Sequence, residues 1–119
     1  MTKIREISQR LVDLLELDIE AGTPIYIGKS NAIHMSQKHN ADYRAFRKHL
    51  PEILLKPDYV GINPNDEPVE YVKIFENNGV FVKVAVRISH GNVCYARTIY
   101  SRDLAKLTPL VSSGHLIKY

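Results

Sequence analysis

The strongest constraint on the fold is a strict alternation of apolar and other residues between positions 80 and 88. Valine or isoleucine occupies every second position, and the residues between them are Phe81, Lys83, Ala85 and Arg87. Successive side chains of a strand point to opposite faces of a sheet. The pattern therefore predicts a half-buried central strand with one apolar face and one face that carries cations.

Turn signals flank this strand on both sides. Asn77, Asn78 and Gly79 precede it, and His90 with Gly91 follows it. Strand-like sequence continues beyond each turn, so residues 69–101 are predicted to form an antiparallel meander of three strands.

The lengths of the two loops predict the pairing register of the meander. A three-residue first loop places Lys73 opposite Lys83, and a two-residue second loop places Lys83 opposite Thr98 and Arg87 opposite Cys94. A two-residue first loop would instead move Lys73 to the apolar face. With the longer loop, the polar face is expected to carry Tyr71, Lys73, Phe75, Phe81, Lys83, Arg87, Thr98 and Tyr100. The apolar face is expected to hold Val72, Ile74, the valine row, Val93, Tyr95 and Ile99, and strand parity assigns Arg97 to it as well.

Helical patterns dominate the chain before the meander. Apolar residues from Ile4 to Leu15 recur at spacings of three and four, which predicts an N-terminal helix capped by Thr2 and ending near Leu17. The remaining expected elements are a strand at 25–27, helices at 30–39 and 40–50, a helical turn at 51–56, a strand at 59–63, a polar loop at 63–68, a helical stretch at 103–107, and a tail without pattern. The predicted fold class is α+β, with N-terminal helices packed on one face of an antiparallel meander sheet.

The composition is typical of one small globular domain spanning residues 1–119. A formal charge of +3 and a pI near 9.0 favour polyanionic partners. Cys94 is the only cysteine, which excludes an intrachain disulfide. Because the sequence shows neither a membrane-length apolar run nor a leader pattern, we expect no membrane partner and a cytoplasmic location.

The residue types point to RNA cleavage without a metal ion. That reaction needs a base, an acid and cations that stabilise the charge on phosphorus. His34 and Lys38 share one helix face, and His39 can join the same site only if the helix ends near it. Thr98 and Tyr100 add hydroxyl groups to the cationic sheet face.

Other chemistries find less support in the sequence. His34 and His39 lack the four-residue spacing of a helical zinc motif, and Gly28 lacks the upstream glycine of a nucleotide-binding loop. Neither a metal nor another cofactor is expected. The remaining histidines are not expected to be catalytic: His49, His90 and His115.

Four segments together resemble a known group of nucleases. They are H-M-S-Q-K-H at 34–39, I-L-L-K-P at 53–57 with Asp58, V-E-Y-V-K-I from Val69 and A-R-T-I-Y from Ala96. The chain resembles the phage-associated barnase, EndoU, colicin and RelE-like (BECR) ribonuclease domains. The resemblance implies a BECR-like nuclease fold, with the RNA-cleaving site on the sheet face opposite the helices.

The resemblance also implies roles for particular residues. It suggests that His39, Thr98 and Tyr100 occupy functional positions, with His34 as a secondary candidate. No glutamate matches the catalytic carboxylate of the barnase branch, so the base stays open between His39 and His34. Such domains occur as toxins or in mobile elements, which implies a neutralising immunity or antitoxin protein.

The resulting hypothesis is a metal-independent endoribonuclease that leaves a 2′,3′-cyclic phosphate. Its candidate catalytic residues are His39, His34, Thr98 and Tyr100, and its candidate RNA-binding residues are Lys38, Lys73, Lys83, Arg87 and Arg97. Two alternatives stay open: a noncatalytic module of a phage or mobile element that binds nucleic acid or protein, and a structural phage or conjugation protein.

Overall fold

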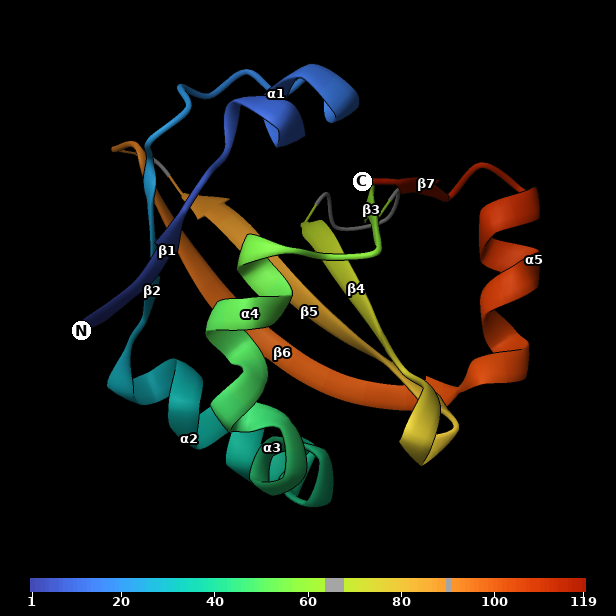
Figure 1. Ribbon diagram of the computed structural model, residues 1–119. Coiled ribbons are helices and arrows are strands. Elements are labelled where there is room, and N and C mark those ends of the chain that lie inside the picture. Colours follow the sequence, from blue (N-terminus) through green and yellow to red (C-terminus); the bar gives the residue numbers. More distant parts are fainter. Residues whose placement is uncertain (64–67, 90) are drawn as a thin grey trace.

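The valine alternation forms a central strand of a mixed sheet, seen in a computed structural model that describes residues 1–63, 68–89 and 91–119 (Figure 1). Within the described residues the sheet has seven strands in the order β1-β2-β6-β5-β4-β3-β7. The strands are β1 (Thr2–Glu6), β2 (Pro24–Ile27), β3 (Tyr59–Ile62), β4 (Val69–Phe75), β5 (Val80–Ser89), β6 (Val93–Asp103) and β7 (Leu116–Lys118). All neighbouring pairs are antiparallel except β2 and β6, which run parallel.

Helices cover both faces of this sheet unequally. They are α1 (Gln9–Leu15), α2 (Lys29–Lys38), α3 (Asn40–Phe46), α4 (Leu50–Leu55) and α5 (Leu107–Ser112), with short 3-10 turns η1 (Arg47–His49), η2 (Glu76–Asn78) and η3 (Leu104–Lys106). Side chains of α1 to α4 pack with the β5 valines in the larger core, and Figure 1 shows α4 in front of the sheet. A smaller core joins Phe81 and Val72 to Leu107 of α5 on the other face. The α+β class, with helices packed on an antiparallel meander, is confirmed.

The first predicted helix is wrong in its first half. Residues Thr2–Glu6 form β1, which pairs with β2, and the helix begins only at Gln9. Ser8 is its N-cap, because its hydroxyl accepts a hydrogen bond from the Leu11 amide at 3.0 Å. Ile4 and Ile7 have helical spacing, but pairing of β1 with β2 determines the local structure instead. Tertiary context often overrides local propensity in this way.

Both predicted hairpin registers are wrong by one residue. Residues 76–79 form a four-residue connection, with η2 followed by Gly79 at φ +65°, so Lys73 pairs with Val82. A slip of one residue moves every side chain to the other face. Lys73 therefore lies on the helix-covered face, where its ammonium donates to the Lys56 carbonyl at 2.8 Å, and Val72 and Ile74 lie on the opposite face.

In the second hairpin, Ser89 pairs with Val93 and Arg87 with Tyr95, so Val93 and Tyr95 also change faces. A bulge then adds one residue to β6 after Ala96, and Lys83 pairs with Tyr100 rather than Thr98. The bulge returns Thr98 and Tyr100 to the face on which the sequence placed them.

Most other predicted elements are confirmed within a residue or two. These are the strands at 25–27 and 59–63, the helix near 30–39 and the turn at 51–56. The helix predicted at 40–50 ends earlier, because α3 stops at Phe46 and the 3-10 turn η1 continues to His49. The predicted helical stretch at 103–107 is η3 with the start of α5, and β7 was missed in the tail. The predicted loop at 63–68 falls mostly outside the described residues, and so does His90 of the predicted second turn. No described helix has the length and apolar character needed to cross a membrane.

Candidate active site

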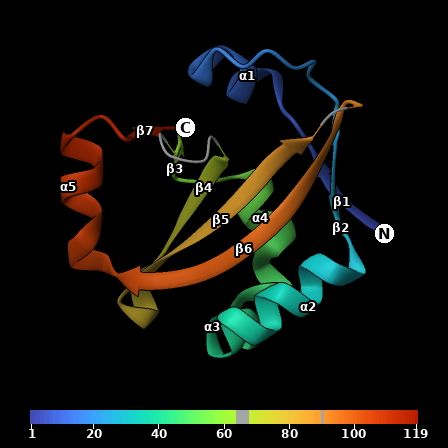
Figure 2. The ribbon, with the colours of Figure 1, turned by 180° about the vertical axis from the view of Figure 1, so that it is seen from behind.

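A cleft of about 350 Å³ opens on the sheet face opposite α4, beside α2. Figure 2 shows the backbone from this side, with α2 next to β6. Residues from α2, β4, β5, β6 and the chain around 63 and 68 line it: His34, Lys38, Asn63, Pro68, Glu70, Ala85, Arg87, Arg97, Thr98 and Tyr100. The predicted convergence of the early helix and the later strands is therefore present in the structure.

The floor of the cleft is one row of paired residues across three strands. Glu70 of β4 pairs with Ala85 of β5, and Ala85 pairs with Thr98 of β6. Paired residues share a face with Cβ atoms about 5 Å apart, so the methyl group of Ala85 leaves space between the larger side chains. Arg87 follows two residues along β5 on the same face, beside this hollow.

The parallel pairing of β2 with β6 places α2 at the cleft. The pairing of β2 with β6 is confined to the start of β6, at Cys94 and Tyr95. Beyond the end of β2, α2 packs along β6 in its place. His34 and Lys38, one helical turn apart, both line the cleft, as their spacing predicts.

His39 lies at the C-terminal end of α2 and takes a different position. It is not among the residues lining the cleft; its ring stacks on Tyr100, with centroids 5.3 Å apart and planes at 28°. Asp42 of α3 fixes this corner, because its carboxylate accepts hydrogen bonds from the Ser101 amide at 2.9 Å and the Ser101 hydroxyl at 2.6 Å. The imidazole of His39 thus contacts a cleft residue, Tyr100, without lining the cleft itself.

A β-bulge brings Arg97 into the cleft. Ala96 pairs with Val86 and Thr98 pairs with Ala85, so Arg97 is the extra residue on β6. A bulge re-aims side chains that simple alternation would send elsewhere. Arg97 therefore lines the cleft, although strand parity assigned it to the apolar face.

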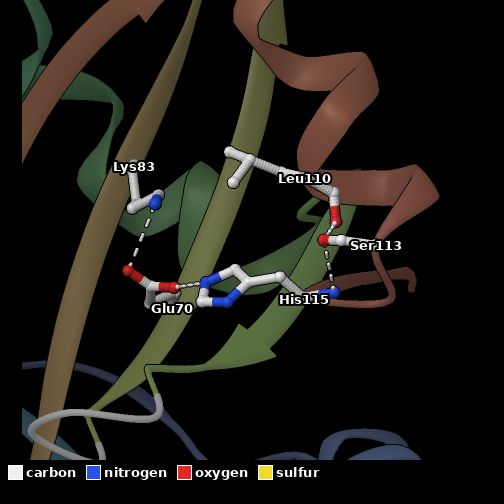
Figure 3. Close-up of polar contacts among 5 residues, drawn as sticks. All are labelled: Glu70, Lys83, Leu110, Ser113 and His115. Atoms are coloured by element: carbon white, nitrogen blue, oxygen red, sulfur yellow. Dashed lines mark hydrogen bonds and ion pairs between the residues drawn. The ribbon is translucent and has the colours of Figure 1, made fainter.

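Glu70 is the central residue that sequence reasoning missed. It is only 3% exposed, yet it lines the cleft, and Figure 3 shows its carboxylate between Lys83 and His115. One oxygen contacts Lys83 Nζ at 3.2 Å, and the other contacts His115 Nε2 at 2.6 Å. A buried charge is costly unless it is paired, and Glu70 is paired on both sides.

The predicted site residues thus fall into four groups. His39 stacks on Tyr100 and does not line the cleft. The cleft brings together His34, Lys38, Arg87, Arg97, Thr98 and Tyr100. Lys83 is buried behind it against Glu70, with its ammonium 5.8 Å from the Tyr100 ring centroid. Lys73 lies on the opposite face, which corrects its placement with Lys83. Sequence reasoning missed Glu70 because the incorrect register placed its side chain on the apolar face of the sheet, with Val72 and Ile74.

The cleft is electropositive within the described residues. Lys38, Arg87 and Arg97 line it against the single carboxylate of Glu70. Arginine presents a planar set of donors that suits a phosphate, and a concave cationic surface concentrates polyanions.

Two titratable side chains on the other side of the sheet contribute no chemistry near neutral pH. Burial raises the pKa of the Cys94 thiol from 9.0 to about 11, which keeps it protonated, and burial raises the pKa of the Tyr71 phenol still further above its ordinary range. Cys94 is a fully buried strand residue, as its position predicted. In the described part of the chain, no three His, Cys, Asp or Glu side chains gather as a metal site.

Comparison with known proteins identifies the family of the chain. No curated protein and no solved structure matches the chain. A family model described as phage-Barnase-EndoU-ColicinE5/D-RelE like nuclease3 matches residues 2–108. This match spans every strand except β7, and with it all residues that line the cleft. The chain therefore belongs to the phage-Barnase-EndoU-ColicinE5/D-RelE like nuclease3 family.

Proposed function

We propose that this nuclease cleaves RNA by internal transesterification, and that the cleft beside α2 is its active site. The observation that carries the proposal is one buried carboxylate, Glu70, at the edge of a cleft that also holds an imidazole and two arginines. These are the groups that the reaction requires: a base, an acid and fixed cations.

Glu70 is the proposed general base. Its carboxylate accepts the proton of a ribose 2′-hydroxyl, and the resulting oxygen nucleophile attacks the adjacent phosphorus. Each carboxylate oxygen has two lone pairs, so the contacts with Lys83 and His115 leave acceptor capacity for this proton.

His34 is the proposed general acid. In its protonated form it gives a proton to the 5′-oxygen as the bond from phosphorus to that oxygen breaks. The products are a 2′,3′-cyclic phosphate and a 5′-hydroxyl. His34 lines the cleft directly, whereas His39 is stacked on Tyr100, so the geometry favours His34 of the two histidines.

The remaining cleft residues bind and orient the phosphate. Arg87 and Arg97 approach from β5 and β6, and Lys38 approaches from α2. Their positive charges offset the charge that develops on the phosphorus oxygens in the transition state. Thr98 lies on the cleft floor opposite Ala85 and offers a hydroxyl donor.

The proposal is tested by incubating the purified protein with an RNA and a DNA of the same sequence in the presence of EDTA. We expect cleavage of the RNA alone, with new 2′,3′-cyclic phosphate ends. Binding of RNA without new ends would support a noncatalytic module, and loss of activity in EDTA would indicate metal-dependent chemistry.

His34→Ala and His39→Ala form a matched pair, because one removes an imidazole from α2 and the other removes an imidazole from its C-terminal cap. We expect His34→Ala to reduce cleavage by about 10²–10⁴-fold, the usual contribution of a proton-transfer group. His39→Ala should have the smaller effect, through loss of the Tyr100 stack. The opposite ranking would make His39 the acid.

Two expectations from the sequence stay part of this proposal. One is a cytoplasmic location. The other is a neutralising immunity or antitoxin protein; such a partner would need an acidic surface to cover the cationic cleft. Co-purification of the active protein with an acidic partner that blocks RNA cleavage would support the second.

A further inference from the structure

We propose that His115 is a positioning residue that holds the Glu70 carboxylate in its reactive orientation. The proposal rests on the proposed function, in which Glu70 is the general base. It assigns a role to a histidine that lies outside residues 2–108, the part of the chain matched by the family model.

The contact itself is short and largely shielded from water. His115 Nε2 lies 2.6 Å from Glu70 Oε1, and the two side chains are 22% and 4% exposed. An ionised carboxylate only accepts hydrogen bonds, so the imidazole donates through Nε2. Lys83 holds the other oxygen at 3.2 Å, and the carboxylate is thus fixed from two sides (Figure 3).

His115 does not share the cleft with the substrate. Glu70 lines the cleft, whereas His115 lines a separate hollow with Gly61, Ile62 and Ile117. His115 thus contacts Glu70 without lining the cleft, which suits a residue that orients the base rather than one that reacts.

The surrounding chain is arranged to deliver His115 to this position. Leu116 of β7 pairs with Gly61 of β3, and Gly61 pairs with Glu70 of β4. A Cβ atom on Gly61 would lie 2.2 Å from the His115 carbonyl oxygen, so only glycine permits this approach. The missing side chain lets His115 reach across β3 to Glu70.

The C-terminal end of α5 fixes the turn before His115. The Ser113 hydroxyl donates to the Leu110 carbonyl at 3.1 Å and accepts from the His115 amide at 3.3 Å (Figure 3). Gly114 between them has φ +82°, a conformation that glycine adopts without strain. The short C-terminal segment therefore presents the imidazole in one defined direction.

The test compares His115→Leu with His115→Gln in the full chain. Leucine keeps apolar bulk but has no donor, whereas the glutamine amide can donate near the position of Nε2. We expect His115→Leu to lower kcat by on the order of 10–100-fold, because small misplacements of a catalytic group have effects of this size. KM should change little, since Arg87, Arg97 and Lys38 do not depend on His115. His115→Gln should recover most of the lost kcat.

A double-variant comparison separates positioning from general structural support. If His115 acts through Glu70, His115→Leu should have little further effect in a Glu70→Gln background, and the two losses will not add. Equal losses in both backgrounds, a loss confined to KM, or no recovery with glutamine would overturn the proposal. Full activity of Glu70→Gln would instead refute the base assignment, and full activity of His115→Leu with an inactive Glu70→Gln would refute only the role of His115.

Discussion

The sheet face opposite α1 to α4 has two halves of opposite character. In one half, α5 seals an apolar cluster in which Val72 and Phe81 are fully buried against Leu107. In the other half, the same two strands present Glu70 and Arg87 to an open cleft. Glu70 and Val72 are only two positions apart on β4, so the change from core to candidate active site is abrupt.

The alternation of side chains along a strand does not by itself determine which residues form the core. Strand parity determines which residues share a face, but the element that covers part of that face determines which of them become core. Lys83 pairs with Val72 at the boundary, and it is buried with its charge matched by Glu70. If the two halves are independent, a change in one half should leave the property of the other half intact.

Removal of the carboxylate should have the largest effect. We expect Glu70→Gln to lower the rate of RNA cleavage by about 10²–10⁴-fold, because the amide cannot accept the 2′-hydroxyl proton. Single-turnover cleavage measures this change. A variant that cleaves as fast as the parent would remove Glu70 from the mechanism.

Glu70→Gln also leaves the Lys83 ammonium buried without its counter-ion, which destabilises the fold. The double variant Glu70→Gln with Lys83→Met provides the control, since methionine fills similar space without charge. We expect it to regain unfolding free energy in urea but not cleavage. Recovery of cleavage together with stability would mean that the single variant lost activity only through unfolding.

In the sealed half, Phe81→Ala should act on stability. Phe81 is completely buried in the smaller core, and its truncation leaves a cavity. We expect a loss of about 3–5 kcal/mol in unfolding free energy, measured by urea denaturation. Cleavage per folded molecule should stay close to that of the parent, and a catalytic loss as large as that of Glu70→Gln would contradict the division of this face.

Arg87→Ala and Lys73→Ala form a pair that compares the cleft with the helix-covered face. Arg87 is exposed in the cleft, whereas the Lys73 ammonium is bonded to the Lys56 carbonyl on the other side. Loss of one phosphate contact should weaken RNA binding and reduce the slope of log K against log salt by about 0.7. Fluorescence titration at several salt concentrations should show this for Arg87→Ala and not for Lys73→Ala; equal losses would place the RNA elsewhere.

The smallest effect concerns pH and the helix-covered face. Burial raises the pKa of Cys94 to about 11 in the folded protein, above its ordinary value of 9.0. The unfolded thiol therefore ionises first, so the contribution of Cys94 to stability is fully present below about pH 9 and is lost as the pH rises from there toward 11. Urea denaturation of Cys94→Ala across this range should show a weaker fall, and an identical fall would mean that Cys94 makes no contribution.

The sequence predicted the elements better than their alignment. The valine alternation predicted β5, and its two turns predicted the meander, because both signals are local. The register depends on the length of one loop, and the four-residue connection at 76–79 could not be distinguished from a three-residue loop. This error of one residue in the loop length placed Lys73 on the sheet face of the proposed RNA site and Glu70 on the opposite face.

Other parts of the site had no local signal. The bulge at Arg97 is visible only once β5 and β6 are paired, although it is the reason that Arg97 and Thr98 both line the cleft. His115 follows a helix in a tail without periodicity, and its contact with Glu70 spans 45 residues of sequence. Tertiary structure was needed to bring these residues together.

The central claim is attack by a ribose 2′-hydroxyl within the cleft, and one substrate tests it most directly. This is a DNA oligonucleotide with a single ribonucleotide, incubated with the protein in EDTA. We predict one cut, on the 3′ side of that ribonucleotide, with a 2′,3′-cyclic phosphate on one product and a 5′-hydroxyl on the other. Cleavage at deoxynucleotides would contradict the account. So would an intact substrate, if an all-RNA strand of the same sequence is cut and its products lack cyclic phosphate ends.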